Sequence, residues 1–208
     1  MQLPVPMMLG YSARATHTPR NETVCRDQLI RRDIDWPIFI DPMVWPTVFD
    51  VMVDDTCCNG GIARGTSIQD LWGSLDDLRG TLARELSADD WPEGSYQVIA
   101  VALMISAGPI QWPGEPCAFN GPADRDQPDP EWELLGYDVS DEWLLSGLSN
   151  CLSRNDPDFA RWEEWWDHRL NEHGLFTTLD DAREFVPMID DYVKEHAPFH
   201  PYAIWKVQ

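Results

Sequence analysis

A glycine-rich segment has the spacing of a phosphate-binding loop. Residues 60–67 read Gly-Gly-Ile-Ala-Arg-Gly-Thr-Ser, so Gly60 and Gly65 stand where the P-loop has its two glycines. The P-loop lysine, which supplies positive charge to the phosphates, is replaced by Thr66. No strand that ends in a magnesium-binding aspartate is expected downstream. The segment is therefore predicted to be a glycine turn, and no cofactor is expected.

The histidines do not have the spacing of a zinc site. A metalloprotease helix places two histidines four residues apart, with a glutamate between them, so that both reach one metal ion. His168 and His173 are five residues apart, about 140° around a helix at 100° per residue, although Glu172 lies between them. His196 and His200 are four apart, but a proline separates them. No metal site is predicted from these residues.

An acidic loop offers the oxygen ligands that calcium prefers. Its carboxylates are Asp124, Asp126, Asp129 and Glu131. An EF-hand loop that began at Asp124 would need glycine at its sixth position, where Asp129 stands. A solvated acidic loop is the favoured interpretation, and a bound cation is the alternative.

Two segments contain potential nucleophiles. Cys57 and Cys58 have only Arg64 nearby to favour a reactive thiolate, and acidic residues oppose it. Ser146 lies in Leu-Leu-Ser-Gly-Leu-Ser-Asn, which lacks the Gly-x-Ser-x-Gly pattern of serine hydrolases. The five cysteines include no CxxC pair, which favours reduced thiols in a cytosolic protein. No catalytic residue is assigned.

The most prominent chemical pattern combines carboxylates with aromatic rings. Phe159, Trp162 and Trp166 form a stripe on one expected helix, and carboxylates stand away from this stripe. A later expected helix has carboxylates flanking its apolar side. Aromatic anchors are typical of protein interfaces. The candidate partner-binding residues are Glu163, Glu164, Trp165, Asp167, Asp180, Asp181, Glu184, Asp190 and Asp191.

The chain is strongly acidic, and the excess charge lies on its body. The 208 residues contain 36 Asp and Glu against 15 Lys and Arg, a net charge of −21. Residues 1–40 have a net charge of +1, and residues 41–208 one of −22. Such a field repels nucleic acid and acidic membranes and attracts basic proteins. The expected partner is therefore a basic protein. Neither nucleic acid nor a membrane is expected to bind.

Helical periodicity and capping signals predict three helices. Leucines recur at helical spacing over residues 68–86, and Ser74 offers an internal cap that would divide this stretch. The second helix is expected over residues 156–174, with its end at a glycine. The third is expected over residues 178–195, where Pro187 should kink or split it.

Apolar and β-branched stretches predict the strands. They are residues 36–40, 48–53, 96–106, 131–139 and 202–207. Because strands and helices do not alternate, an α+β fold is predicted: a mostly antiparallel sheet with about three helices packed on one face. Residues 1–35 are expected to form an extended or partly ordered N-terminal arm, and residues 36–208 a single domain. No internal repeat is evident.

Two stretches resemble a known class of small bacterial proteins. One is residues 131–151, Glu-Trp-Glu-Leu-Leu-Gly-Tyr-Asp-Val-Ser-Asp-Glu-Trp-Leu-Leu-Ser-Gly-Leu-Ser-Asn-Cys, and the other is residues 170–207, which begins Leu-Asn-Glu-His-Gly-Leu-Phe. They resemble immunity proteins of interbacterial toxin systems, the contact-dependent growth inhibition type included. The resemblance covers a little under a third of the chain and carries no catalytic signature.

The resemblance implies a function that involves binding and no catalysis. Immunity proteins of this kind are cytosolic, non-enzymatic and often acidic, and they block a toxin by direct docking. The chain is thus expected to be a cytoplasmic protein that neutralises a cognate toxin, with a basic nuclease domain as the expected target. Two alternatives stay open. One is a small-molecule enzyme that uses paired carboxylates, and the other is an acidic mimic of nucleic acid.

Overall fold

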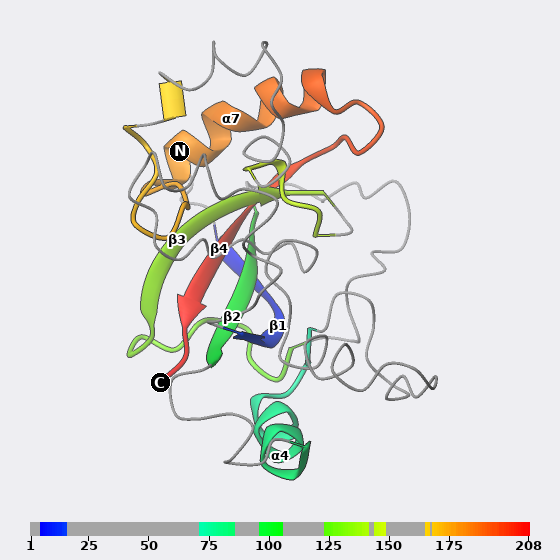
Figure 1. The fold of residues 1–208 in the computed structure, drawn as a ribbon, viewed down its shortest axis with the longest axis vertical. Helices are drawn as coiled ribbons and strands as arrows, with labels where there is room; N and C mark the ends of the chain where they lie inside the picture. The colour runs from blue at the N-terminus through cyan, green and yellow to red at the C-terminus, as the bar shows by residue number, and fades with distance from the viewer. Residues whose placement is uncertain are drawn as a thin grey trace.

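A four-stranded antiparallel sheet forms the centre of the molecule, in the order β1-β2-β4-β3 (Figure 1). The computed structural model describes residues 5–15, 71–85, 96–105, 123–141, 144–148, 165–166 and 168–208. The elements are β1 Val5–Ala15, α4 Leu75–Glu85, β2 Tyr96–Ile105, β3 Glu133–Ser140, α7 Leu179–Tyr192 and β4 His200–Lys206. The predicted α+β class is confirmed. No helix in these ranges has the length and apolar character needed to cross a membrane.

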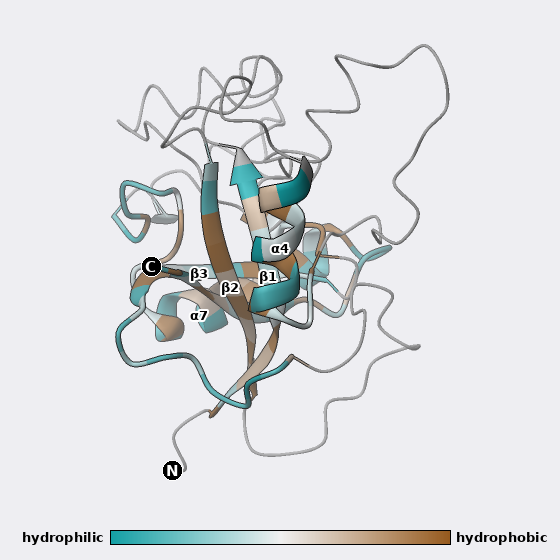
Figure 2. Cartoon of the chain, turned by 90° about the horizontal axis from the view of Figure 1, so that it is seen from below, coloured by the Kyte–Doolittle hydropathy of each residue, from teal (hydrophilic) through white to brown (hydrophobic). Residues whose placement is uncertain are grey.

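Strand β2 is buried on both faces, and the two described helices cover different faces of the sheet. Ile99, Val101 and Leu103 belong to the core cluster that includes α7. Ala100 and Ala102 belong to the cluster that includes α4. Alternate residues of a strand point to opposite faces, so the prediction of helices on one face is wrong for these two. The uninterrupted apolar run of β2, hydrophobic along most of its length in Figure 2, is what a strand covered on both sides requires.

Each helix begins at a hydroxyl cap. The Ser74 side chain accepts a hydrogen bond from the Asp77 N–H (3.2 Å), so α4 starts directly after the internal cap that the sequence offered. The Thr178 side chain accepts one from the Asp181 N–H (3.1 Å) at the start of α7. These bonds satisfy N–H groups that the first helical turn leaves without a partner.

Helix α7 is continuous through Pro187, so the predicted split does not occur. Proline removes one backbone hydrogen bond and crowds the preceding turn. The helix buries Ala182, Phe185 and Ile189 against the sheet, and this packing holds it together across the proline.

The second predicted helix does not extend to Gly174. Residues 165–166 are helical, but Leu170 and Phe176 pair as a β-bridge, and the chain turns between them. The Asn171 side chain organises this turn. Its carbonyl oxygen accepts from the backbone N–H of His173 (2.9 Å), and its amide donates to the Leu135 carbonyl of β3 (2.7 Å). A side-chain amide that bonds the backbone in this way competes with helix formation.

Residues 5–15, which the sequence placed in an N-terminal arm, are extended but form part of the sheet. Strand β1 pairs with β2 from Val5 to Ala15. The bulge between Met8 and Gly10 interrupts the alternation of its side chains, and this obscures the strand pattern. The rest of the predicted arm and the predicted strands 36–40 and 48–53 lie outside the described residues.

Candidate functional site

The outer side of α7 presents three of the candidate carboxylates to solvent. Asp180, Glu184 and Asp191 are exposed, and their spacing of four and seven residues puts them on one side of the helix. The side chains of Asp180 and Asp191 are 91% and 82% exposed. We call these three residues the acidic face of α7.

Two basic side chains lie beside the acidic face, and each forms only a weak, exposed ion pair with it. Arg183 lies 3.6 Å from Asp180, and Lys194 lies 3.2 Å from Asp191. Exposed pairs of this kind contribute at most about 1 kcal/mol. A cation on a partner protein can therefore replace them at little cost.

Two other candidate carboxylates of α7 are engaged in the fold. Asp181 lies 3.0 Å from the Arg169 guanidinium and accepts the Thr178 hydroxyl. Asp190 accepts a hydrogen bond from the Phe199 N–H (2.8 Å), which ties the end of α7 to the start of β4. These groups hold the helix in place and are less accessible to a partner.

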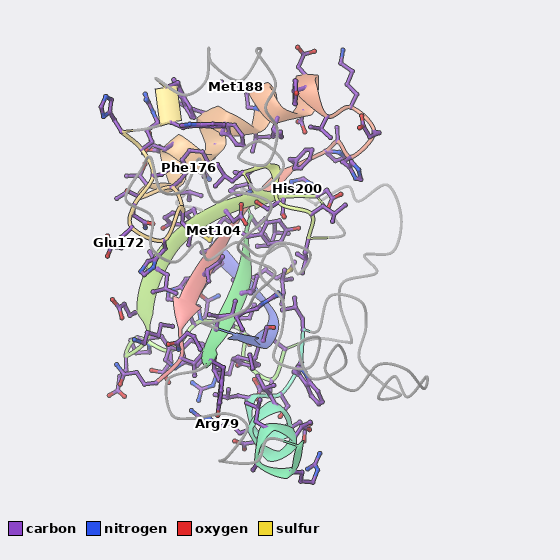
Figure 3. The ribbon with its side chains drawn as sticks, in the orientation of Figure 1. Arg79, Met104, Glu172, Phe176, Met188 and His200 are labelled. Carbon is purple, nitrogen blue, oxygen red and sulfur yellow. The ribbon has the colours of Figure 1, made fainter. Side chains whose placement is uncertain are left out.

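Trp165 belongs largely to the core beneath α7. Its ring stacks against Phe185 with centroids 6.1 Å apart, and it meets Phe176 edge-on at 5.9 Å. Figure 3 labels Phe176 between α7 and the sheet. The Arg169 guanidinium lies 4.4 Å from the Trp165 ring centroid, a cation–π distance. The partly buried indole is therefore an anchor for this segment. Glu163, Glu164 and Asp167 lie outside the described residues.

The carboxylates of the acidic loop also serve the fold. Asp124 accepts the hydroxyl of Tyr11 (2.7 Å) and the first N–H of α4 (3.2 Å). Burial, and then Asp124, raise the pKa of Tyr11. Asp129 accepts from the Glu131 N–H (3.0 Å) and from Arg125 (2.7 Å), which lower its pKa. No group of three or more potential metal ligands occurs within the described ranges. A buried tyrosine needs a partner for its hydroxyl, but the sequence could not show which residue supplies it.

Two buried carboxylates organise the end of β3. Asp138 accepts the hydroxyl of Ser146 (2.7 Å). Asp141 is 3.0 Å from the His196 imidazole, and its carbonyl accepts the hydroxyl of Tyr202 (3.1 Å). Ser146 and His196 thus bond different carboxylates. These bonds fasten the turn after β3 to the chain on either side of it.

The remaining sequence motifs divide into two groups. Residues 60–67, Cys57 and Cys58 lie outside the described residues. His168 and His173 lie in the turn before α7. Within the described residues they do not belong to a group that could hold a metal ion.

Of the described candidate residues, those on the acidic face of α7 are therefore the most accessible to a partner.

No protein-family model, curated protein or solved structure matches the chain.

Proposed function

We propose that this chain is a non-enzymatic immunity protein of the cytoplasm, which binds and neutralises a cognate toxin with a basic surface, such as a nuclease domain. The toxin would be a protein partner, and neither nucleic acid nor a membrane would compete with it. The observation that carries the proposal is the acidic face of α7: Asp180, Glu184 and Asp191, exposed on one side of a helix whose other side is buried in the core.

Electrostatics explains how such a face would work. Residues 179–195 carry six carboxylates and two cations, within a chain of net charge −21. A field of one sign accelerates the encounter with an oppositely charged protein and disfavours wrong partners. The helix is anchored by Phe185 and Ile189, so its carboxylates are held in a fixed pattern before the partner arrives. Preorganisation of this kind reduces the entropy lost on binding.

The test is association with the product of the reading frame next to this gene. The chain and the toxic domain of that product are expected to co-purify as a complex, and the chain should protect cells that make the toxin. The dissociation constant should rise by about tenfold or more between 50 and 300 mM NaCl. Tight binding that is indifferent to salt, or a neighbouring product with no basic domain, would contradict the proposal.

A further inference from the structure

Two parts of the chain share sequence in the same order. Residues 9–11 and residues 135–137 both read Leu-Gly-Tyr. Residues 71–79 read Leu-Trp-Gly-Ser-Leu-Asp-Asp-Leu-Arg, and residues 175–183 read Leu-Phe-Thr-Thr-Leu-Asp-Asp-Ala-Arg. Five of these nine positions are identical, and an aromatic ring and a hydroxyl side chain recur at two more. A repeat was not evident in the sequence alone because spacers of different length separate the two motifs.

The two Leu-Gly-Tyr motifs occupy equivalent places in the sheet. Each lies on an outer strand, β1 or β3, and each contains a bulge just before its glycine. Gly10 pairs with Val101 of β2, and Gly136 pairs with Ile204 of β4. Both glycines have a positive φ, +154° and +146°. The outer strands therefore share their register, their bulge and their backbone conformation.

Each tyrosine after the glycine pairs with the aromatic residue before the helix. Tyr11 exchanges two backbone hydrogen bonds with Trp72 (2.9 and 2.7 Å), and Tyr137 exchanges two with Phe176 (3.0 and 2.9 Å). A Cβ atom on Gly10 would come within 2.6 Å of the Trp72 carbonyl oxygen, and one on Gly136 within 3.0 Å of the Phe176 carbonyl oxygen. At Gly136 the Cβ would also come within 2.8 Å of the Leu175 Cβ and 2.9 Å of the Asn171 side-chain nitrogen. Glycine is therefore required at both places, where the segment before the helix approaches the strand closely.

The helices begin in the same way. Each starts three residues after the bridging aromatic, at Leu75 or Leu179. Ser74 and Thr178 cap the N–H groups of Asp77 and Asp181, the third residue of each helix. The acidic pair in the first turn is favourable at a helix N-terminus in both copies.

The strand pairing completes a two-fold relation. In the order β1-β2-β4-β3, the outer strands exchange and the inner strands exchange under a rotation by half a turn. Val101 and Ile204 hold equivalent positions in their units and pair directly across the β2–β4 junction. The neighbouring pairs, Ala100 with Trp205 and Ala102 with Ala203, exchange under the same rotation.

We infer that the chain contains two copies of one β–α–β unit, β1–α4–β2 and β3–α7–β4, related by a pseudo-two-fold axis through the Val101–Ile204 pair. The copies diverge within the helices. Phe185 and Ile189 of α7 are buried, and Thr81 and Glu85 stand at the corresponding positions of α4. The apolar side of α7 is therefore rotated relative to that of α4. An axis that exchanges neighbouring antiparallel strands is perpendicular to the sheet and keeps each of its faces. The strands, bulges and helix starts therefore follow the two-fold relation, whereas the helices, which pack with different core clusters, depart from it.

The duplication also divides the carboxylates of the proposed docking surface into those that have an acidic counterpart in the first unit and those that do not. Asp180 corresponds to Asp76 of α4, so its presence is explained by its place in the first helical turn. Glu184 and Asp191 correspond to Gly80 and Ser87, and they have no acidic counterpart. If the chain docks as proposed, these two residues distinguish the second unit from the first. This point depends on the proposed function, whereas the duplication does not.

Matched substitutions in the two copies test the duplication by their effect on stability. Gly10→Ala and Gly136→Ala should each lower the melting temperature by several degrees, because each places a Cβ against a carbonyl oxygen. The milder pair, Ser74→Ala and Thr178→Ala, should each lower it by about 2–4 °C. A copy in which both substitutions leave the melting temperature unchanged would overturn the inference.

An exchange variant makes the test specific to the repeat. Residues 73–74 and residues 177–178 are exchanged in the full chain, which puts Thr-Thr before α4 and Gly-Ser before α7. The variant should keep a single cooperative transition within a few degrees of the parent, because each dipeptide enters the same backbone environment. Loss of cooperative unfolding would show that the two helix starts are not equivalent. This readout is independent of toxin binding, so its failure is distinct from failure of the proposed function.

Discussion

Single hydrogen bonds connect segments that lie far apart in the sequence, and the bond between Tyr11 and Asp124 is the clearest case. The buried Tyr11 hydroxyl donates to the carboxylate that also caps α4. A double-mutant cycle with Tyr11→Phe and Asp124→Asn should give a coupling energy of about 1–3 kcal/mol, the range for hydrogen bonds to charged groups. Chemical denaturation of the four proteins measures this energy. Additive single effects would show that the bond does not contribute.

His200 should make stability depend on pH. It is the first residue of β4, and Figure 3 labels it at the end of the sheet nearest α7. Burial lowers the pKa of His200, and Asp190 opposes this in part. Because the pKa is lower in the folded state, the unfolded state takes up the proton first as the pH falls. The stabilisation is therefore complete above the usual histidine pKa of about 6.5 and is lost below it.

The His200→Gln variant tests this dependence. Urea midpoints from pH 7.5 to 5.5 should fall less steeply for the variant than for the parent. The matched control is His168→Gln, the same substitution at an exposed histidine. Identical slopes for the His200 variant and the parent would contradict the proposed coupling of burial to stability.

The candidate side chains show what sequence can and cannot predict about a site. The sequence placed Asp180, Asp181, Asp190 and Asp191 in one acidic helix, and helical geometry predicts which of them share a side. It could not show that Arg169 would reach Asp181, because that ion pair depends on a turn in a stretch whose local pattern predicts helix. The division between exposed and engaged carboxylates therefore required the tertiary structure.

Of the two described helices, α7 contains a proline that destabilises it, and its packing against the sheet compensates for this loss of stability. Pro187 is exposed and lies within the continuous helix. Alanine would restore a backbone N–H and remove the crowding of the preceding turn. Pro187→Ala should raise the free energy of unfolding by about 1–3 kcal/mol, measured by urea denaturation. Glu184→Ala, an exposed change in the same helix, should stay within about 0.5 kcal/mol. A destabilised Pro187 variant would mean that the helix requires its proline.

The elements with complete local signals were predicted, and the others were not. Strands β2, β3 and β4 and helix α7 were predicted to within a few residues, because their apolar patterns and caps are local. Strand β1 was missed because its bulge breaks the alternation of side chains. The turn over residues 168–176 was missed because Asn171 bonds the carbonyl of Leu135, a contact across the fold that no local pattern reveals.

The folded chain as a whole combines a symmetric scaffold with an asymmetric charge distribution. The sheet, its bulges and the helix starts repeat, whereas the carboxylates of α7 beyond its first turn do not. In Figure 1, α4 and α7 lie at opposite ends of the sheet. The first unit therefore offers an internal control for the second. Changes of equal charge can be made on α7 or on α4 and the acidic loop, so that general electrostatic attraction and docking at one face give different results.

The most direct test compares two variants that each lose three carboxylates and have a net charge of −18 instead of −21. One carries Asp180→Asn, Glu184→Gln and Asp191→Asn on α7. The other carries Asp76→Asn, Asp77→Asn and Asp126→Asn, all exposed and away from α7. Calorimetry measures the affinity of each variant for the basic domain of the neighbouring gene product. The α7 variant should bind about tenfold or more weakly than the parent, and the control within about threefold. Equal weakening of both variants, or none in the α7 variant, would contradict docking at this face.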